Sequence, residues 1–124
     1  MSTNFVDLVG SSYAALARGD LDLVAAHCDP EIEIVEPPDR PGAGVHHGHE
    51  GLIEALSRMN ELPATEAREP ERFIDAGRER VIVLTGSRVD LLTGRAGKCI
   101  RWEMFSKLDD AFAAIGLRKL KGET

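Results

Sequence analysis

The sequence predicts a single α+β domain in which three helices of the N-terminal half pack on a curved antiparallel sheet. Apolar residues recur at helical spacing in three segments before Pro63. After that point the period changes to two, which is typical of β-strands. Short turns separate these later strands, and strands joined by short turns pair antiparallel. With 124 residues the chain is long enough for one core, so we expect one domain over residues 1–124.

The expected elements follow the order α-α-β-β-α-β-β-β-β. Gly19 ends the first helix and Asp20 caps the second. Helices are expected at 4–18, at 21–28, and from 48 or 49 to the residues before Pro63. Strands are expected at 31–36, 45–47, 65–75, 80–92, 98–108 and 113–121, with a short helix over 110–120 as the alternative to the last strand.

Composition and charge exclude several classes of protein. The chain is 43% hydrophobic and 29% charged, which is typical of a globular protein. The net charge is −6 and no basic cluster occurs, so we expect no nucleic-acid partner. No apolar run reaches membrane-spanning length and residues 1–4 carry no secretory leader, so we expect a cytoplasmic protein. Cys28 and Cys99 form no metal or redox motif and are interpreted as reduced core thiols.

The strand at 31–36 carries the first candidate for chemistry. Its period of two places Glu36 on the same face as Ile32 and Ile34. A carboxylate on an apolar face costs folding energy unless it is paired, hydrogen-bonded or neutral. Pro37 ends the strand directly after it. Glu36 therefore either lies at the inner lip of a strand end, ready for chemistry, or turns out to solvent where the strand frays.

Glu103 is the candidate partner of Glu36. Two carboxylates in one apolar pocket do not both ionise cheaply, so one stays protonated as a donor and the other acts as a base. This arrangement suits proton transfer beside a carbonyl group. Arg101 lies two residues away on the same strand face, so an ordinary surface pair of Arg101 and Glu103 is the alternative.

Arg88 and Asp90 form a second candidate pair. The period of two places them on one face, and we group Ile82, Leu84 and Leu92 with them. A charge pair on a largely apolar face is either a buried structural ion pair or a functional one. Tyr13, on the first helix, is either a core residue or a donor that aims its hydroxyl into a pocket.

The histidine-rich segment at 46–50 is interpreted as part of a pocket mouth. Its spacing does not match a helical zinc site, so we expect no metal. The candidate ligand contacts are His46, His47, Phe5, Met59, Arg101 and Phe105.

The face of the sheet that the helices leave open is expected to need a cover. Ile100, Trp102 and Met104 are predicted to lie on it, and a homodimer through this outer face would bury them.

Three short motifs carry a resemblance that extends over nearly the whole chain. They are the Tyr13 segment ending in Gly19-Asp20-Leu21-Asp22, the segment Asp29-Pro30-Glu31-Ile32-Glu33, and Gly48-His49-Glu50-Gly51. Together with the element order they resemble the nuclear transport factor 2-like superfamily, and within it the SnoaL-like polyketide cyclase group. The resemblance implies a cone in which the sheet wraps a pocket closed by the first helices.

Two branches of that superfamily suggest roles for particular residues. Similarity to ketosteroid isomerases implies that Glu36 is the base and Glu103 a protonated donor. The tyrosine that those enzymes carry on the first helix falls nearest to Ser12 here, and Tyr13 is displaced from that position by one residue. Arg88-Val89-Asp90, followed by Thr93-Gly94, resembles the water-activating segment of limonene epoxide hydrolases.

The resemblance and the candidate residues together imply an enzyme. We expect cofactor-free isomerisation or cyclisation of a hydrophobic carbonyl compound. One alternative is a hydrolase that positions water with Arg88 and Asp90. The other is a ligand-binding or dimerisation module without chemistry.

Overall fold

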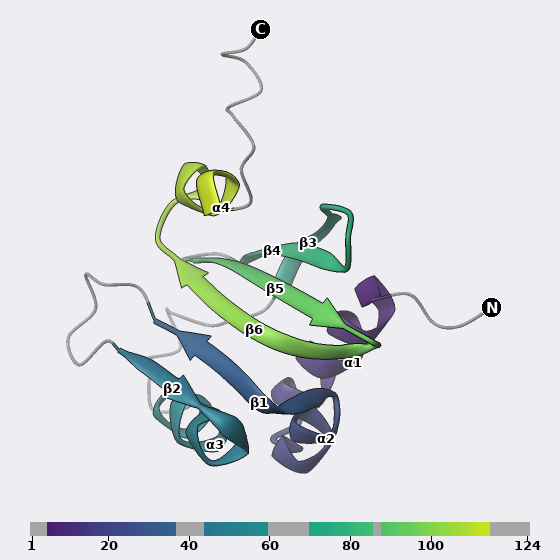
Figure 1. The fold of residues 1–124 in the computed structure, drawn as a ribbon, viewed down its shortest axis with the longest axis vertical. Coiled ribbons are helices and arrows are strands. Elements are labelled where there is room, and N and C mark those ends of the chain that lie inside the picture. The colour runs from purple at the N-terminus through teal and green to yellow at the C-terminus, as the bar shows by residue number, and fades with distance from the viewer. Residues whose placement is uncertain (1–4, 37–43, 60–69, 86–87, 115–124) are drawn as a thin grey trace, which may run out of the picture.

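The computed structural model describes residues 5–36, 44–59, 70–85 and 88–114, without the side chains of residues 58 and 59. The helices are α1 (Phe5–Ala17), α2 (Leu21–Ala26), α3 (Gly48–Met59) and α4 (Leu108–Ala114). The strands are β1 (Cys28–Val35), β2 (Val45–His47), β3 (Pro70–Asp75), β4 (Arg80–Thr85), β5 (Val89–Arg95) and β6 (Lys98–Phe105). The predicted α+β class is confirmed, with helices in the N-terminal half against one curved sheet (Figure 1).

The six strands form one sheet in the order β2-β1-β6-β5-β4-β3. The pairs β3–β4, β4–β5 and β5–β6 are antiparallel, as the short turns predicted. The pair β1–β6 is parallel, so the expectation of antiparallel pairing throughout is wrong at this one junction. Parallel neighbours need a long crossover, and here the chain between β1 and β6 supplies α3 and four other strands.

The segment predicted as one strand over 80–92 is two strands. Thr85 bonds back to Arg88: its backbone nitrogen and its hydroxyl oxygen lie 2.9 and 2.8 Å from the Arg88 carbonyl oxygen, and both donate to it. This connection turns β4 into β5, and the two strands then pair antiparallel. The turn was missed because both strands are apolar, so their sequences read as one run.

The end of the chain differs from the first expectation as well. Residues 108–114 form α4, where a turn and the beginning of a strand over 113–121 were predicted. The alternative, a short helix, is the better description, and residues 115–121 lie outside the described part. Asp109 and Asp110 lie in the first turn of α4, where the helix dipole favours acids.

Two buried clusters lie on the two faces of the sheet. The inner cluster joins α1, α2 and α3 to the sheet, so we call this side the inner face. Its fully buried members include Val9, Leu52, Leu56, Ile32, Ile34, Val83, Trp102 and Met104. The outer cluster is smaller and packs Ala111, Leu108 and Phe112 of α4 against Ile82, Val89, Leu91 and Phe105 on the outer face.

The predicted dimer surface is therefore wrong in its residues. Trp102 and Met104 are each 1% exposed and lie in the inner cluster, beneath the helices. Ile100 is half-buried at a bulge, since Gly94 pairs with Cys99 whereas Thr93 pairs with Arg101. Alternation along a strand separates two faces but does not say which of them the helices cover. A homodimer stays a prediction without a defined surface.

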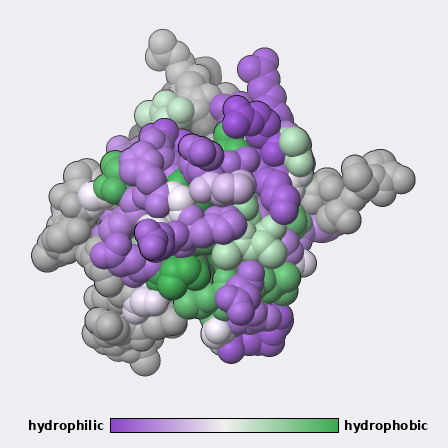
Figure 2. Space-filling view, turned by 60° about the horizontal axis from the view of Figure 1, so that its bottom comes forward, coloured by the Kyte–Doolittle hydropathy of each residue, from purple (hydrophilic) through white to green (hydrophobic). Residues whose placement is uncertain are grey.

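The described surface is mostly polar. Hydrophilic side chains cover most of the face in Figure 2, with an apolar area in its lower centre. Among the described residues, Val45 is the large hydrophobic side chain that stands out as exposed, at 52%. No helix within the described ranges is long and apolar enough to cross a membrane.

Candidate functional site

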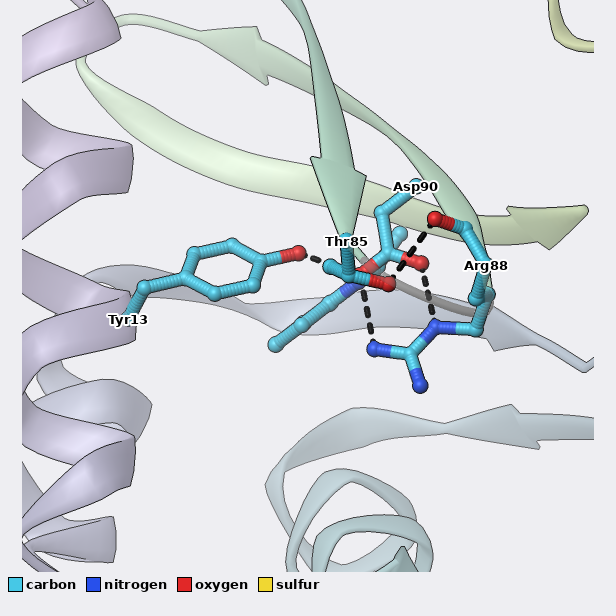
Figure 3. Close-up of polar contacts among 5 residues, drawn as sticks. Tyr13, Thr85, Arg88 and Asp90 are labelled. Atoms are coloured by element: carbon cyan, nitrogen blue, oxygen red, sulfur yellow. Dashed lines mark hydrogen bonds and ion pairs between the residues drawn. The ribbon is translucent and has the colours of Figure 1, made fainter. Parts of the chain in front are cut away.

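A buried polar cluster lies on the inner face around Asp90. We call Tyr13, Thr85, Arg88, Asp90 and Trp102 the Asp90 cluster (Figure 3). Asp90 is 0% exposed and Arg88 is 3% exposed, so both charges are removed from water. A buried charge is costly unless it is paired and hydrogen-bonded. The contacts of this cluster meet that condition.

Four donors surround the Asp90 carboxylate. Arg88 forms two hydrogen bonds, Nε to Oδ1 at 2.6 Å and Nη2 to Oδ2 at 3.0 Å. Trp102 Nε1 donates to Oδ2 at 3.2 Å, and the Tyr13 hydroxyl donates to the same oxygen. A carboxylate has about four acceptor positions, so these four donors use its capacity. Asp90 is therefore an anchor for its neighbours and is poorly placed to take a proton from a ligand.

The sheet register explains why these residues meet. Asp90 pairs with Val83 of β4 and Met104 of β6, in the middle of the sheet and on the inner face. Arg88 lies two residues earlier, so its side chain points to the same side. Ile82 and Leu84, which the sequence grouped with this pair, lie with the outer cluster instead. The turn between β4 and β5 breaks the alternation on which that grouping relied.

The two titratable partners of Asp90 both keep their protons. Burial, followed by the Asp90 charge and its hydrogen bond, raises the pKa of Tyr13 well above its usual range. Burial lowers the pKa of Arg88, but the charge and hydrogen bonds of Asp90 outweigh it, and the net pKa is raised. At neutral pH the cluster therefore holds a neutral phenol and a charged guanidinium.

Removing the Tyr13 hydroxyl is expected to cost stability in a pH-dependent way. Tyr13→Phe leaves Asp90 with one donor fewer, which we expect to lower the free energy of unfolding by about 1.5–3 kcal/mol near pH 7. Because the folded pKa lies above the unfolded value, the hydroxyl's contribution is complete below about pH 10 and is lost as the pH rises further. Urea unfolding of both proteins from neutral to alkaline pH measures the difference.

The chain contains a single tyrosine, so tyrosinate absorbance reports Tyr13 directly. We expect no tyrosinate in the folded protein at the pH where urea-unfolded protein is half ionised. Equal titration of folded and unfolded protein would contradict the buried hydrogen bond.

Glu36 and His46 form a second polar contact on the inner face. Glu36 is 5% exposed, so it points inward, as one of the two interpretations predicted. His46 Nε2 lies 3.0 Å from Glu36 Oε2, and His46 Nδ1 lies 4.0 Å from Oε1 of the exposed Glu54 on α3. The imidazole thus lies between a buried and an exposed carboxylate.

The register brings Glu36 and Asp90 to the same face. Val35 of β1 pairs with Glu103 of β6, so Glu36 continues level with Met104. Asp90 pairs with Met104 from the other side. Two strand spacings, about 10 Å, therefore separate the backbones of Glu36 and Asp90 across β6. The inner face carries two carboxylates with different partners.

Gly51 allows α3 to lie against His46. A Cβ at Gly51 would lie 2.9 Å from the His46 Cβ and 3.1 Å from the His46 carbonyl carbon. The second of these atoms belongs to the backbone of β2, which cannot turn aside as a side chain can. Glycine at this helical position therefore sets how closely α3 covers the Glu36–His46 contact.

Gly51→Ala is expected to lower the free energy of unfolding by about 1–2 kcal/mol, because overpacking outweighs the better helix propensity of alanine. Gly10→Ala in α1 is the matched control, since a Cβ there meets nothing within 4 Å. It should instead raise stability by about 0.5–1 kcal/mol. Urea unfolding of both variants provides the comparison. Stabilisation by Gly51→Ala would contradict the close packing of α3 against His46.

Four predicted site residues lie away from this face. Arg101 Nη1 lies 2.6 Å from Glu33 Oε1, and its Nε lies 3.4 Å from Glu103 Oε2. His47 Nδ1 lies 3.9 Å from Glu33 Oε2, so these side chains form a charged row across the outer face of β2, β1 and β6. Phe105 packs in the outer cluster. The surface-pair alternative for Glu103 is the observed one, and a Glu36–Glu103 pair does not form.

Among the remaining predicted ligand contacts, the structure describes the side chains of Phe5 and His46 but not that of Met59. Phe5 is buried in the inner cluster, against Gly94 of β5. Met59 ends α3, but its side chain lies outside the described part. His46 and His47 line an open hollow of about 520 Å³ between β2 and α3, together with Val45, Glu50, Gly51 and Glu54. Within the described ranges, no cluster of three or more acidic, histidine or cysteine side chains could hold a metal ion.

Sequence reasoning missed two members of the Asp90 cluster. Trp102 was assigned to the dimer surface, although its alternation with Met104 could have placed both in the core. Thr85 was missed because its role depends on the turn between β4 and β5. Ser12 Oγ, which lies 2.8 Å from His27 Nδ1, is a further polar contact that no sequence pattern signalled.

Comparison with known proteins supports the same architecture. The family model described as the SnoaL-like domain matches residues 9–109. No curated protein matches the chain significantly. The fold is similar to the crystal structure of an NTF2-like protein of unknown function from Burkholderia pseudomallei K96243, at 23% identity and a TM-score of 0.70, with 93% of this chain and 99% of that chain covered.

Two further solved structures are similar over most of their length. An NTF2-like protein from Burkholderia xenovorans LB400 is 28% identical, with a TM-score of 0.65 and coverage of 81% of this chain and 86% of that chain. TerC, co-crystallised with polyporic acid, is 25% identical, with a TM-score of 0.72 and coverage of 90% and 97%.

Proposed function

Because the chain belongs to the SnoaL-like domain family, we propose that it is a cofactor-free enzyme that transfers a proton on a small, largely apolar carbonyl compound. In this proposal the ligand binds on the inner face. Glu36 removes and returns the proton, and Arg88 binds the oxygen on which negative charge develops. The observation that carries the proposal is the pair of buried carboxylates on one apolar face, one saturated by donors and the other paired with a histidine.

Arg88 is the proposed oxyanion donor because Asp90 fixes the guanidinium through two of its three nitrogens. Asp90 binds Nε and Nη2, and the remaining terminal nitrogen points away from Asp90 in Figure 3. A guanidinium carries five N–H donors in a rigid plane. Donors fixed before the reaction stabilise developing charge at little reorganisation cost. Tyr13 and Trp102 then act as positioning residues through Asp90, which replaces the role first expected for Tyr13.

Glu36 is the proposed base because of its position and its partner. It lies at the end of β1 among Ile32, Ile34 and Met104, on the face that the helices cover. His46 orients the carboxylate, and its other ring nitrogen faces the exposed Glu54. This arrangement offers the proton a path toward solvent after each turnover.

One comparison supports the choice of ligands. TerC was crystallised with polyporic acid, and it is 25% identical to this chain. A buried guanidinium suits the oxygen of an acid or of an enolate. Enolisable ketones and polyporic acid itself are therefore the first ligands to test.

A hydrolase and a ligand-binding module are the two alternative functions. A hydrolase would activate water with Arg88 and Asp90, which are joined by two hydrogen bonds. The four donors around the Asp90 carboxylate leave little acceptor capacity for the water molecule that this role requires. A binding module would hold its ligand on the inner face without chemistry.

The chain's single tryptophan offers a screen that needs no turnover. Trp102 is 1% exposed and donates to Asp90, so a ligand on the inner face should change its fluorescence. Ligands found in this way are then incubated with the protein in D2O, and loss of the acidic C–H signal is followed by proton NMR. We expect exchange faster than in buffer alone for at least one ligand. Binding without exchange would favour the binding module, and addition of water would favour the hydrolase.

A further inference from the structure

We propose that Cys28 and Cys99 are a modification site at which a hydroperoxide forms a disulfide between β1 and β6. The two residues are direct Cα partners in the parallel ladder of these strands. Both are free thiols, 4% and 3% exposed, and both belong to the inner cluster. The proposal does not depend on the function proposed above.

A cross-link between these two cysteines would join two parts of the sheet. β1–β6 is the parallel junction between the β2–β1 pair and the four-stranded antiparallel part. The ladder is interrupted between Cys28 and Glu33, so the cysteine pair lies at one end of this junction, where Cys99 N also donates to the His27 carbonyl oxygen at 3.0 Å. Glu36 follows β1, and the Asp90 cluster belongs to the other part of the sheet. A disulfide would therefore fasten the two parts that carry the candidate site.

The geometry suits a disulfide. Direct partners on neighbouring strands lie about 4.8 Å apart, and disulfides join Cα atoms roughly 4.4–6.8 Å apart. The hydrogen bond with Cys28 and, after it, burial raise the pKa of Cys99, which agrees with the pairing of the two residues in the ladder. Cys99 Sγ also lies 3.4 Å from the Arg101 carbonyl oxygen, to which it donates.

The chemistry balances with one equivalent of a hydroperoxide. A thiolate attacks the peroxide oxygen, the O–O bond breaks, and a sulfenic acid and a hydroxide (or alkoxide) form. The neighbouring thiol then attacks the sulfenic sulfur, the S–S bond forms, and water leaves. Two thiols are oxidised and one peroxide is reduced. A small oxidant is required because both side chains are buried, and the raised pKa of Cys99 makes attack by its thiolate slow.

The cross-link should stabilise the fold. It joins residues that are far apart in the chain, so it removes much freedom from the unfolded state. For a loop from Cys28 to Cys99 we expect the midpoint of thermal unfolding to rise by about 10 °C.

The test treats the full chain with hydrogen peroxide and follows its intact mass. We expect the mass of two hydrogen atoms to be lost, a cross-linked peptide containing Cys28 and Cys99 in a non-reducing digest, and reversal by dithiothreitol. The oxidised protein should melt higher than the reduced protein. Cys28→Ala and Cys99→Ala are the controls: each should gain oxygen at the remaining cysteine and show no rise in melting temperature after treatment.

Three results would overturn the proposal. One is irreversible oxidation of wild-type cysteines to sulfinic acid without a cross-link. Another is a disulfide only between different molecules. The third is no reaction of the folded protein under conditions that oxidise the urea-unfolded chain.

Discussion

Replacing Asp90 with leucine is expected to lower the free energy of unfolding by about 3–5 kcal/mol, because the buried charge of Arg88 then loses its partner. Tyr13 and Trp102 lose their acceptor at the same time. This is the largest stability effect that we expect from a single substitution among the described residues. Urea unfolding followed by circular dichroism measures it.

A double variant separates the charge from the packing. Arg88→Met combined with Asp90→Leu removes both charges and should recover most of the loss, since a buried ion pair is replaced by apolar side chains of similar size. Glu33→Gln is the matched control for an exposed pair, and its effect should stay below about 1 kcal/mol. If Asp90→Leu alone behaved like Glu33→Gln, the Asp90 cluster would not be the buried network described here.

Glu36→Gln is expected to slow hydrogen exchange of a bound ligand by about 10²–10⁴-fold, the usual contribution of a positioned general base. Glutamine keeps the size of the side chain and an acceptor for His46, so the fold and ligand binding should persist. Proton NMR in D2O gives the exchange rate, and Trp102 fluorescence shows that the ligand still binds.

Glu103→Gln provides the matched control for this prediction. Glu36 follows β1 and Glu103 lies on the neighbouring strand β6, but Glu103 pairs with Arg101 on the outer face. We expect the exchange rate of Glu103→Gln to equal that of wild type. Equal loss in both variants would indicate a general change in the sheet and not the removal of a base.

The sequence predicted the class and the order of most elements because the signals are local. Helical spacing, the Gly19-Asp20 boundary and the change of period after Pro63 each depend on neighbouring residues. The sequence did not predict the turn between β4 and β5, and it offered a helix near α4 only as the alternative to a strand. In both segments small or apolar residues fit two conformations, and contacts from distant strands decide between them.

The sequence predicted several residues of the candidate site, but it predicted few of the contacts among them. The inward direction of Glu36 and the grouping of Arg88 with Asp90 follow from alternation along one strand. The partners of Asp90 depend on strand register and on the packing of α1, which no short motif encodes. The same limit explains Glu103 and Trp102. Alternation separated them correctly, but the assignment of inner and outer face was reversed.

The most direct test of the account is a crystal structure of the protein with the best ligand from the fluorescence screen. We predict a ligand oxygen within hydrogen-bond distance of the Arg88 guanidinium and the reacting carbon facing Glu36, both on the inner face. A ligand bound instead in the hollow between β2 and α3, or on the charged row of the outer face, would contradict the proposed site.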